Sequence, residues 1–196
     1  MKQTKKHYDD IAKEYNESRQ TGLVGFLVKR ESEAIMQRLN VQVGEDILDA
    51  GCGSGFYAEK ILKLGGKVFG VDLSPEMVNV CIAKGIDAVQ GDLTELNLHR
   101  QYKKILCAGS LEFIEDQTQL FNSLTSHLDT SGKLFCLFPR FNWAGFLYRL
   151  YHFSHGVRIL LFNSSDCEKI AEDNGLEIID ICYPEPLTKL VTFQKK

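Results

Sequence analysis

Residues 49–55 (DAGCGSG) form a glycine-rich turn directly after the short apolar run Ile47-Leu48. Glycines let the backbone turn sharply and approach a ligand closely, and a helix beginning near Phe56 would direct unpaired N–H groups at the same space. An acidic residue, Asp72, ends the next apolar run about twenty residues later. A carboxylate at this spacing accepts hydrogen bonds from both ribose hydroxyls in nucleotide-binding βαβ units. This combination predicts a pocket for a nucleoside cofactor.

The residue at position 56 helps to distinguish between cofactors. In the dinucleotide fingerprint the sixth position of the turn is a third glycine, where helix and strand pack closely. Counted from Gly51, the sixth position is Phe56, a bulky ring. The sequence therefore disfavours an NAD-dependent oxidoreductase.

Several segments together resemble one family. Residues 47–55 (ILDAGCGSG) are similar to motif I of the class I S-adenosylmethionine-dependent methyltransferases. Residues 68–77 (VFGVDLSPEM), 88–93 (AVQGDL) and 105–113 (ILCAGSLEF) resemble the family's second, third and fourth strands with their following loops. Residues 7–15 (HYDDIAKEY) resemble the leading helix that closes over the cofactor in its small-molecule branch. The resemblance implies S-adenosylmethionine as cofactor and S-adenosylhomocysteine as product.

The resemblance also implies roles for residues around the adenosine. Asp72 would bind the ribose, and Leu73 would lie against the adenine. Asp92 would accept a hydrogen bond from the adenine amino group, while the backbone N–H of Leu93 would face a ring nitrogen. The strongest single assignment is Asp72.

At the methionine end, the resemblance gives backbone carbonyls of Cys107 and Ala108 as partners. Asp49 would orient the glycine loop and the methionine amino group, or it would cap the helix that follows. Tyr8 would close over the cofactor. The expected cofactor-binding residues are Tyr8, Asp49, Ala50, Gly51, Gly53, Asp72, Leu73, Met77, Gly91, Asp92, Leu93, Cys107 and Ala108.

The catalytic residues stay unassigned at this stage. The cofactor carries an activated methyl group, so the protein mainly has to orient the acceptor and exclude water. After the fourth strand, where many relatives carry histidine, this chain has Glu112-Phe113, so no histidine base is transferred from the family. The candidates for a base are Glu112, His152, His155 and Tyr15, and for each a purely structural role is the favoured interpretation.

Composition narrows the class of protein. The formal net charge of −3 argues against a surface that follows phosphates, so nucleic acid is an unlikely partner. Six cysteines without a CxxC pair suggest neither a disulfide framework nor a metal site, and without a signal peptide they favour a cytoplasmic protein. No apolar stretch reaches the roughly eighteen residues that a membrane helix needs.

Apolar runs alternate with helical segments along the chain, which predicts an α/β fold with a mostly parallel sheet. The turn at residues 183–186 joins two strands that must run antiparallel. We expect a Rossmann-like, doubly wound, seven-stranded sheet with a final antiparallel strand. We also expect one domain over residues 1–196, with cofactor-covering helices over about 1–42. The expected strands are 46–50, 67–72, 86–90, 103–109, 132–138, 176–182 and 187–193, and the expected helices are 4–18, 25–39, 55–64, 75–84, 116–128 and one from 164 that Gly175 ends.

The segment over about 139–162 holds the only tryptophan and a dense group of rings. Its aromatic residues fall on more than one helical face, as in a helix that is buried or covers something. We expect a lid over an apolar or planar substrate at the carboxyl edge of the sheet. Two alternatives remain: the rings extend the core or form a dimer contact, or the segment rests peripherally on a membrane surface.

The sequence therefore predicts a methyltransferase acting on the oxygen or nitrogen of a small metabolite. A non-catalytic protein that binds S-adenosylmethionine or S-adenosylhomocysteine is the alternative. A tRNA, rRNA or protein methyltransferase is less favoured, because residues 108–111 read AGSL where amino-methylating families carry Asn or Asp before Pro-Pro-Tyr. Both a monomer and a homodimer are compatible with the sequence.

Overall fold

The fold is a seven-stranded sheet in the order β3-β2-β1-β4-β5-β7-β6, seen in a computed structural model that describes residues 22–196. Strand β7 is antiparallel to both of its neighbours, and the pairs from β3 to β5 are parallel. The predicted fold class is confirmed. The strands are β1 (Asp46–Ala50), β2 (Lys67–Asp72), β3 (Asp87–Gln90), β4 (Tyr102–Ala108), β5 (Leu128–Pro139), β6 (Leu176–Cys182) and β7 (Thr188–Lys195).

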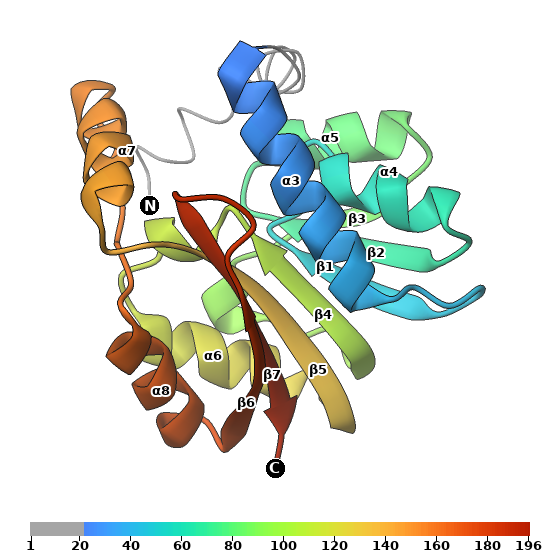
Figure 1. Ribbon diagram of the computed structural model, residues 1–196. Coiled ribbons are helices and arrows are strands. Elements are labelled where there is room, and N and C mark those ends of the chain that lie inside the picture. Colours follow the sequence, from blue (N-terminus) through green and yellow to red (C-terminus); the bar gives the residue numbers. More distant parts are fainter. Residues whose placement is uncertain (1–21) are drawn as a thin grey trace.

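Helices cover both faces of the sheet (Figure 1). One face packs against α3 (Gly22–Leu39), α4 (Phe56–Lys63) and α5 (Pro75–Ala83), with Ile35 and Ile61 in the core on that side. The other face packs against α6 (Gln117–Ser126) and α8 (Ser164–Asp173) around a cluster of phenylalanine rings. A further helix, α7 (Trp143–Ser154), stands apart from both layers beyond the end of β5 (Figure 1).

Local sequence signals explain where two of the helices begin. The side chain of Ser74 accepts a hydrogen bond from the amide of Met77 at 3.2 Å, and Pro75 occupies the first turn of α5, as the sequence predicts. Helix α8 begins with a capping box in which Asn163 and Asp166 each accept a hydrogen bond from the other's backbone.

One strand is longer than its apolar run. We expected a strand over 132–138, whereas β5 begins at Leu128 and ends at Pro139. Tyr102 pairs with Leu128, and a register shift separates this pair from Lys104 and Lys133. The polar start of β5 is therefore held by strand pairing across an irregularity, which hydropathy alone does not reveal.

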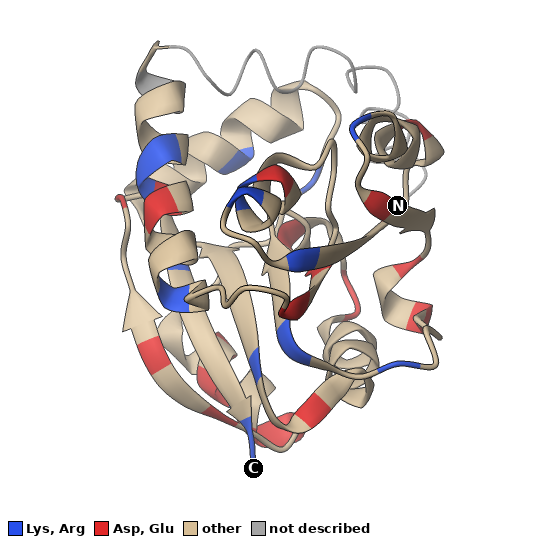
Figure 2. Cartoon of the chain, turned by 90° about the vertical axis from the view of Figure 1, so that its right-hand side faces the viewer, with Lys and Arg blue, Asp and Glu red and all other residues tan. Residues whose placement is uncertain are grey.

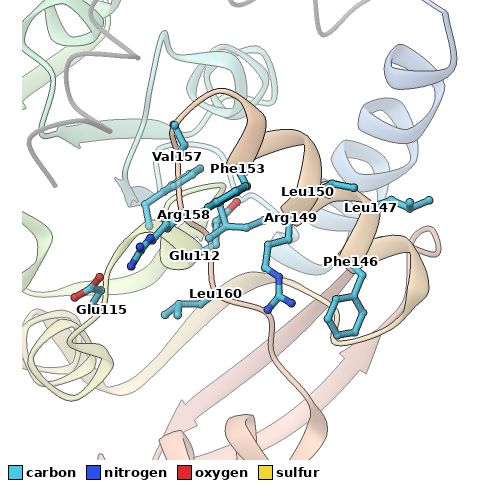
Figure 3. A pocket seen from close by; sticks show the side chains of 13 residues that line it. Glu112, Glu115, Phe146, Leu147, Arg149, Leu150, Phe153, Val157, Arg158 and Leu160 are labelled. Atoms are coloured by element: carbon cyan, nitrogen blue, oxygen red, sulfur yellow. The ribbon is translucent and has the colours of Figure 1, made fainter.

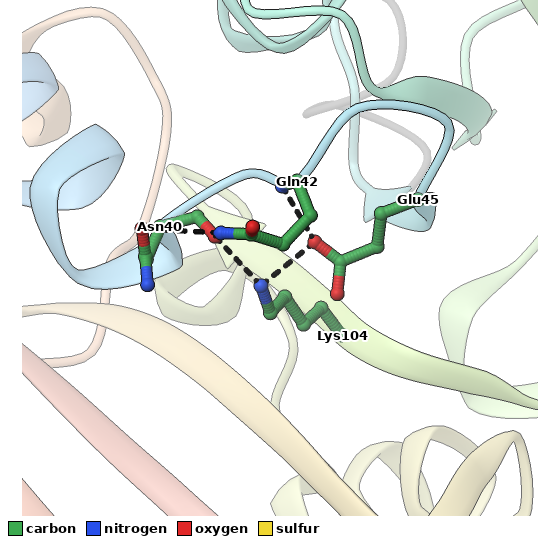
Figure 4. Close-up of polar contacts among 4 residues, drawn as sticks. All are labelled: Asn40, Gln42, Glu45 and Lys104. Atoms are coloured by element: carbon green, nitrogen blue, oxygen red, sulfur yellow. Dashed lines mark hydrogen bonds and ion pairs between the residues drawn. The ribbon is translucent and has the colours of Figure 1, made fainter.

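A polar cluster joins the end of α3 to the amino ends of β1 and β4 (Figure 4). The ammonium of Lys104 donates to the Glu45 carboxylate at 2.7 Å and to the Asn40 carbonyl at 3.0 Å. The backbone amide of Gln42 donates to the same Glu45 oxygen at 3.1 Å. This cluster holds the start of β1 in place at the amino ends of the strands, whereas the glycine turn lies at their carboxyl ends.

Charges of both signs alternate along the exposed side of α3 (Figure 2), where Lys29 and Glu33 lie one turn apart at 3.9 Å. Within residues 22–196, no helix has the length and apolar character required to cross a bilayer. The expected helix over 4–18, including Tyr8 and Tyr15, lies outside the described residues.

Candidate active site

The candidate site lies where the strand order reverses, between β1 and β4. Chain connections leave β1 toward β2 on one side, while β4 lies on the other. The β1–β4 pairing ends at Asp49 and Leu106, whereas β4 continues to Ala108. In open α/β sheets this point forms a crevice at the carboxyl ends of the strands, where ligands bind.

The glycine turn is held at the mouth of this crevice. The amides of Gly51 and Cys52 both donate to the carbonyl of Val71, at 2.7 and 3.0 Å. Gly51 has φ +82°, and a Cβ there would lie 1.9 Å from the Ser110 hydroxyl. Gly53 has φ +51°, but a Cβ there would meet nothing within 4 Å. Packing therefore requires the first glycine, whereas the second faces open space that a ligand can enter.

Asp72 fastens this turn from the end of β2. Its carboxylate accepts from the amide of Gly53 at 2.8 Å and from the amide of Ser74 at 2.9 Å. Its own carbonyl accepts from Gly91 at 2.9 Å. Both bonds hold the carboxylate beside the glycine turn, where the resemblance to the methyltransferase family places the ribose of the cofactor.

Asp49 is a buried carboxyl group beneath the turn. Burial, reinforced by the nearby charge of Asp72, raises its pKa from 3.8 to about 7, and a hydrogen bond from the backbone of Ala58 partly opposes this shift. Its Oδ2 atom is buried and has no hydrogen-bond partner in the described chain. The contact with Ala58 agrees with the capping interpretation. The unpaired Oδ2 in addition fits a cationic ligand, so both interpretations of Asp49 are compatible with the structure.

Residues expected around the adenine lie after β2 and β3. The Asp92 carboxylate accepts from the amide and the hydroxyl of Thr94, at 3.0 and 2.8 Å, and so caps the short helix η1 (Leu93–Glu95). Leu73 is half-buried, whereas the side chains of Leu93 and Met77 are buried in the core. The expected contact of Met77 with the cofactor stays a prediction.

Cys107 and Ala108 form the end of β4, where only β5 still pairs with it. The role expected for their backbone carbonyls stays a prediction. Burial raises the pKa of the Cys107 thiol well above its usual value, and the charges of Glu112 and Asp49 add to this effect. Cys107 therefore stays a neutral thiol and is unsuited to act as a nucleophile.

The candidate bases have different surroundings in the structure. Glu112 is buried, its carbonyl accepts from the amide of Leu160 at 2.8 Å, and its charge acts on Cys107 beside the crevice. His152 is buried among aromatic rings, with the Tyr148 ring 4.4 Å and the Phe113 ring 5.9 Å away. His155 is exposed at the end of α7, where its Nδ1 lies 2.8 Å from the Tyr151 carbonyl. Of the three candidates within residues 22–196, Glu112 is the one beside the expected methionine end, whereas Tyr15 lies outside the described residues.

A cavity of about 980 Å³ opens between α7 and the loop after β4 (Figure 3). Phe146, Leu150 and Phe153 line it from α7 while remaining exposed, and Glu112 lines it from the segment after β4. The exposed rings of α7 contradict the alternative in which this segment extends the core. The complete lining is Glu112, Phe113, Glu115, Phe146, Leu147, Arg149, Leu150, Phe153, Gly156, Val157, Arg158, Ile159 and Leu160.

Two residues that contact the glycine turn were not predicted from the sequence. Lys84, at the end of α5, donates to the carbonyl of Ser54 at 2.8 Å and pairs with Glu59 of α4 at 2.5 Å, which joins the glycine turn and α4 to the end of α5. Ser110 occupies the space beside Gly51 and lies 3.4 Å from the Gly51 carbonyl. No sequence pattern marks Lys84, whereas Ser110 could have been inferred from the glycine opposite it.

Comparison with known proteins agrees with this site. Residues 47–132 match a family model described as a methyltransferase domain. A malonyl-[acyl-carrier protein] O-methyltransferase of Ilyobacter polytropus is 34% identical over 96 residues, which is 45% of this chain and 36% of that protein. A ubiquinone biosynthesis O-methyltransferase of Xanthomonas euvesicatoria is 31% identical over 111 residues, 53% of this chain and 46% of that protein. These matches span less than half the length of either relative.

Among solved structures, magnesium protoporphyrin IX methyltransferase from Synechocystis superposes with a TM-score of 0.71 at 20% identity, covering 90% of this chain and 89% of that one. The chain thus has the fold of the class I methyltransferases. The family model described as a methyltransferase domain matches less than half of the chain, over residues 47–132.

Proposed function

We propose that this protein is an S-adenosylmethionine-dependent methyltransferase that acts on a small, apolar or planar metabolite at an oxygen or nitrogen atom. The observation that carries the proposal is the crevice itself. A glycine turn open at Gly53 lies between Asp72 and the buried, partly unpaired carboxyl group of Asp49. A nucleoside ribose and a cationic amino acid end fit these two carboxylates.

S-adenosylmethionine supplies an electrophilic methyl group on a sulfonium. In our proposal the residues of this chain bind and position. Asp72 holds the ribose, Asp92 and the amide of Leu93 orient the adenine, and the carbonyls of Cys107 and Ala108 hold the amino group. Transfer forms a bond from the acceptor atom to the methyl carbon and breaks the sulfur–carbon bond. The acceptor proton passes to water or to a nearby base.

The cavity beside α7 supports the proposed acceptor class. Its walls are mostly aliphatic and aromatic, and it lies next to the end of β4, where the methionine end of the cofactor is expected. The named activities of the O-methyltransferase relatives agree with an oxygen acceptor. We assign Glu112 as the leading candidate for a base, because it is the candidate that lines this cavity.

The test is methyl transfer from S-adenosylmethionine labelled at the methyl group to a panel of phenols, quinols and carboxylic acids. We expect labelled product with the wild-type chain, and less than a tenth of that rate with Asp72→Ala. Binding of S-adenosylhomocysteine without any transfer would favour the non-catalytic alternative. Binding of neither compound would overturn the proposal.

A further inference from the structure

The outward face of α7 is unusually apolar for a surface helix. Trp143 is 72% exposed, and five other large apolar or aromatic side chains on this helix are also exposed. The buried side carries Ala144, Gly145 and His152. At 100° per residue, the exposed set spans a continuous arc of the helix. The members of this apolar face are Trp143, Phe146, Leu147, Leu150, Tyr151 and Phe153.

Basic residues flank this apolar face. Residues 139–162 contain Arg140, Arg149 and Arg158 but no Asp or Glu. The guanidinium of Arg149 lies 4.6 Å from the centre of the exposed Phe146 ring. The acidic residues near the helix, Glu112 and Glu115, belong to the opposite wall of the cavity (Figure 3). The helix therefore combines exposed rings and leucines with positive charge.

We propose that the apolar face of α7 docks on an anionic lipid surface. Interfacial helices bury Trp, Phe and Leu at the level of the headgroups and are attracted by Lys and Arg to anionic lipids. A second copy of this chain fits the face less well. A twofold contact through it would oppose the arginines of one copy to the same arginines of the other, with no acid on the helix to neutralise them.

The small residues on the buried side explain how α7 is held in place. A Cβ at Gly145 would lie 1.9 Å from the carbonyl of Arg140, so the helix approaches the preceding turn closely. The side chain of Asn142 accepts from the amide of Gly145 at 2.9 Å and donates to the carbonyl of Pro186 at 2.9 Å. These contacts anchor the first turn of α7 to the domain, so the apolar face lies on the side of the helix opposite Gly145, where it is exposed and borders the cavity.

The single tryptophan makes the proposal directly testable, because all indole fluorescence of the full-length chain comes from Trp143. The chain is titrated with phosphatidylcholine vesicles and with vesicles that also contain phosphatidylglycerol. We expect a blue shift of the emission with the anionic vesicles, quenching by brominated acyl chains, and weaker binding as salt is raised. Unchanged emission and no quenching with the anionic vesicles would overturn the proposal.

Variants distinguish a specific contribution of the apolar face to vesicle binding from a general effect of added negative charge. Leu147→Glu and Leu150→Glu should each weaken vesicle binding at least tenfold, because both side chains are exposed and would be buried in the lipid. Ile82→Glu adds the same charge at an exposed position on α5 and should leave binding unchanged. Circular dichroism verifies that each variant is folded.

Two further outcomes would also overturn the proposal. One is wild-type vesicle binding by the folded Leu147→Glu and Leu150→Glu variants. The other is a concentration-dependent dimer in sedimentation, abolished by Leu150→Glu, in a chain that does not bind vesicles. The vesicle assay contains neither cofactor nor acceptor, so its result is independent of the proposed methyl transfer.

Discussion

The carboxylate of Asp72 accepts a hydrogen bond of 2.8 Å from the backbone amide of Gly53. Nineteen positions separate the two residues in the sequence, yet this contact joins the end of β2 to the middle of the glycine turn. The proposed ribose ligand thus also shapes the loop that approaches the cofactor. A change at Asp72 should therefore affect both the contact and the loop.

Replacing Asp72 should strongly weaken cofactor binding. Asp72→Ala removes the ribose acceptor and the partner of Gly53, so we expect the dissociation constant of S-adenosylhomocysteine to rise more than tenfold in calorimetry. Asp87→Asn changes an exposed acid at the start of β3 and serves as the control, with unchanged affinity expected. Wild-type affinity in a folded Asp72→Ala variant would contradict the assignment.

The two glycines at the turn should respond differently to the same substitution. In Gly51→Ala the new methyl group overlaps Ser110 at positive φ, so we expect a loss of about 2–4 kcal/mol in the free energy of unfolding. In Gly53→Ala we expect a loss of only about 1 kcal/mol, because its Cβ has no neighbour within 4 Å.

Cofactor affinity completes this comparison. The methyl group of Gly53→Ala enters the proposed cofactor space, so we expect roughly tenfold weaker binding of S-adenosylhomocysteine, about 1.4 kcal/mol. Denaturant unfolding and calorimetry on the two variants measure both quantities. Equal losses of stability, or full affinity in Gly53→Ala, would contradict the geometry proposed for the turn.

The pKa of Asp49 predicts a dependence of stability on pH. Burial raises this pKa from 3.8 to about 7, so over that range the folded chain keeps a proton that the unfolded chain has lost. The contribution of Asp49 to stability should therefore fall as the pH rises through this window, by at most about 1.4 kcal/mol per pH unit. Asp49→Asn should remove this contribution. Identical pH profiles for wild type and variant would show that the carboxyl group is not perturbed.

The same group should make cofactor binding depend on pH in the opposite direction. A cationic ligand favours the ionised form of Asp49, so S-adenosylmethionine should bind more tightly near pH 8 than near pH 6. Calorimetry in buffers of different ionisation enthalpy should also detect proton release. The Asp49→Asn variant should bind S-adenosylmethionine more weakly, and its affinity should no longer depend on pH. If the affinity of this variant still changed with pH, another group would be responsible for the pH dependence.

The polar cluster around Lys104 should contribute to the stability of the fold but not to cofactor binding. Lys104→Met leaves the largely buried Glu45 carboxylate without its cation, so we expect a loss of about 1–3 kcal/mol in unfolding free energy. Lys103→Met, at the exposed neighbouring position, should change stability little. Cofactor affinity should stay within about twofold of wild type for both variants. A large loss of cofactor affinity in Lys104→Met would show that the amino ends of the strands are coupled to the site at their carboxyl ends.

Sequence reasoning succeeded where local chemistry decides the structure. The bounds of β1 and β2 and the cap at Ser74 follow from short apolar runs and a Ser-Pro start, because these signals act over a few residues. The long start of β5 and the clamp of Lys84 on Ser54 depend on partners distant in the chain. A single sequence carries no pattern for such contacts.

In the site, too, features set by nearby residues were predicted from the sequence, whereas features set by distant contacts were not. The positions of the three acids of the site follow from the strands that precede them. Asp49 and Asp72 lie at the carboxyl ends of β1 and β2, and Asp92 follows the end of β3. The outward direction of the rings on α7 could not be read from the sequence, because its aromatic residues occur on several helical faces. Packing of Gly145 against Arg140 decides which side of the helix is buried.

Isothermal titration calorimetry of the full chain with S-adenosylmethionine and S-adenosylhomocysteine tests the central claim most directly. We predict saturable binding of both compounds at one site per chain, and competition between them. A folded chain, verified by its thermal transition, that gives no binding heat with either compound at any temperature tested would contradict the account.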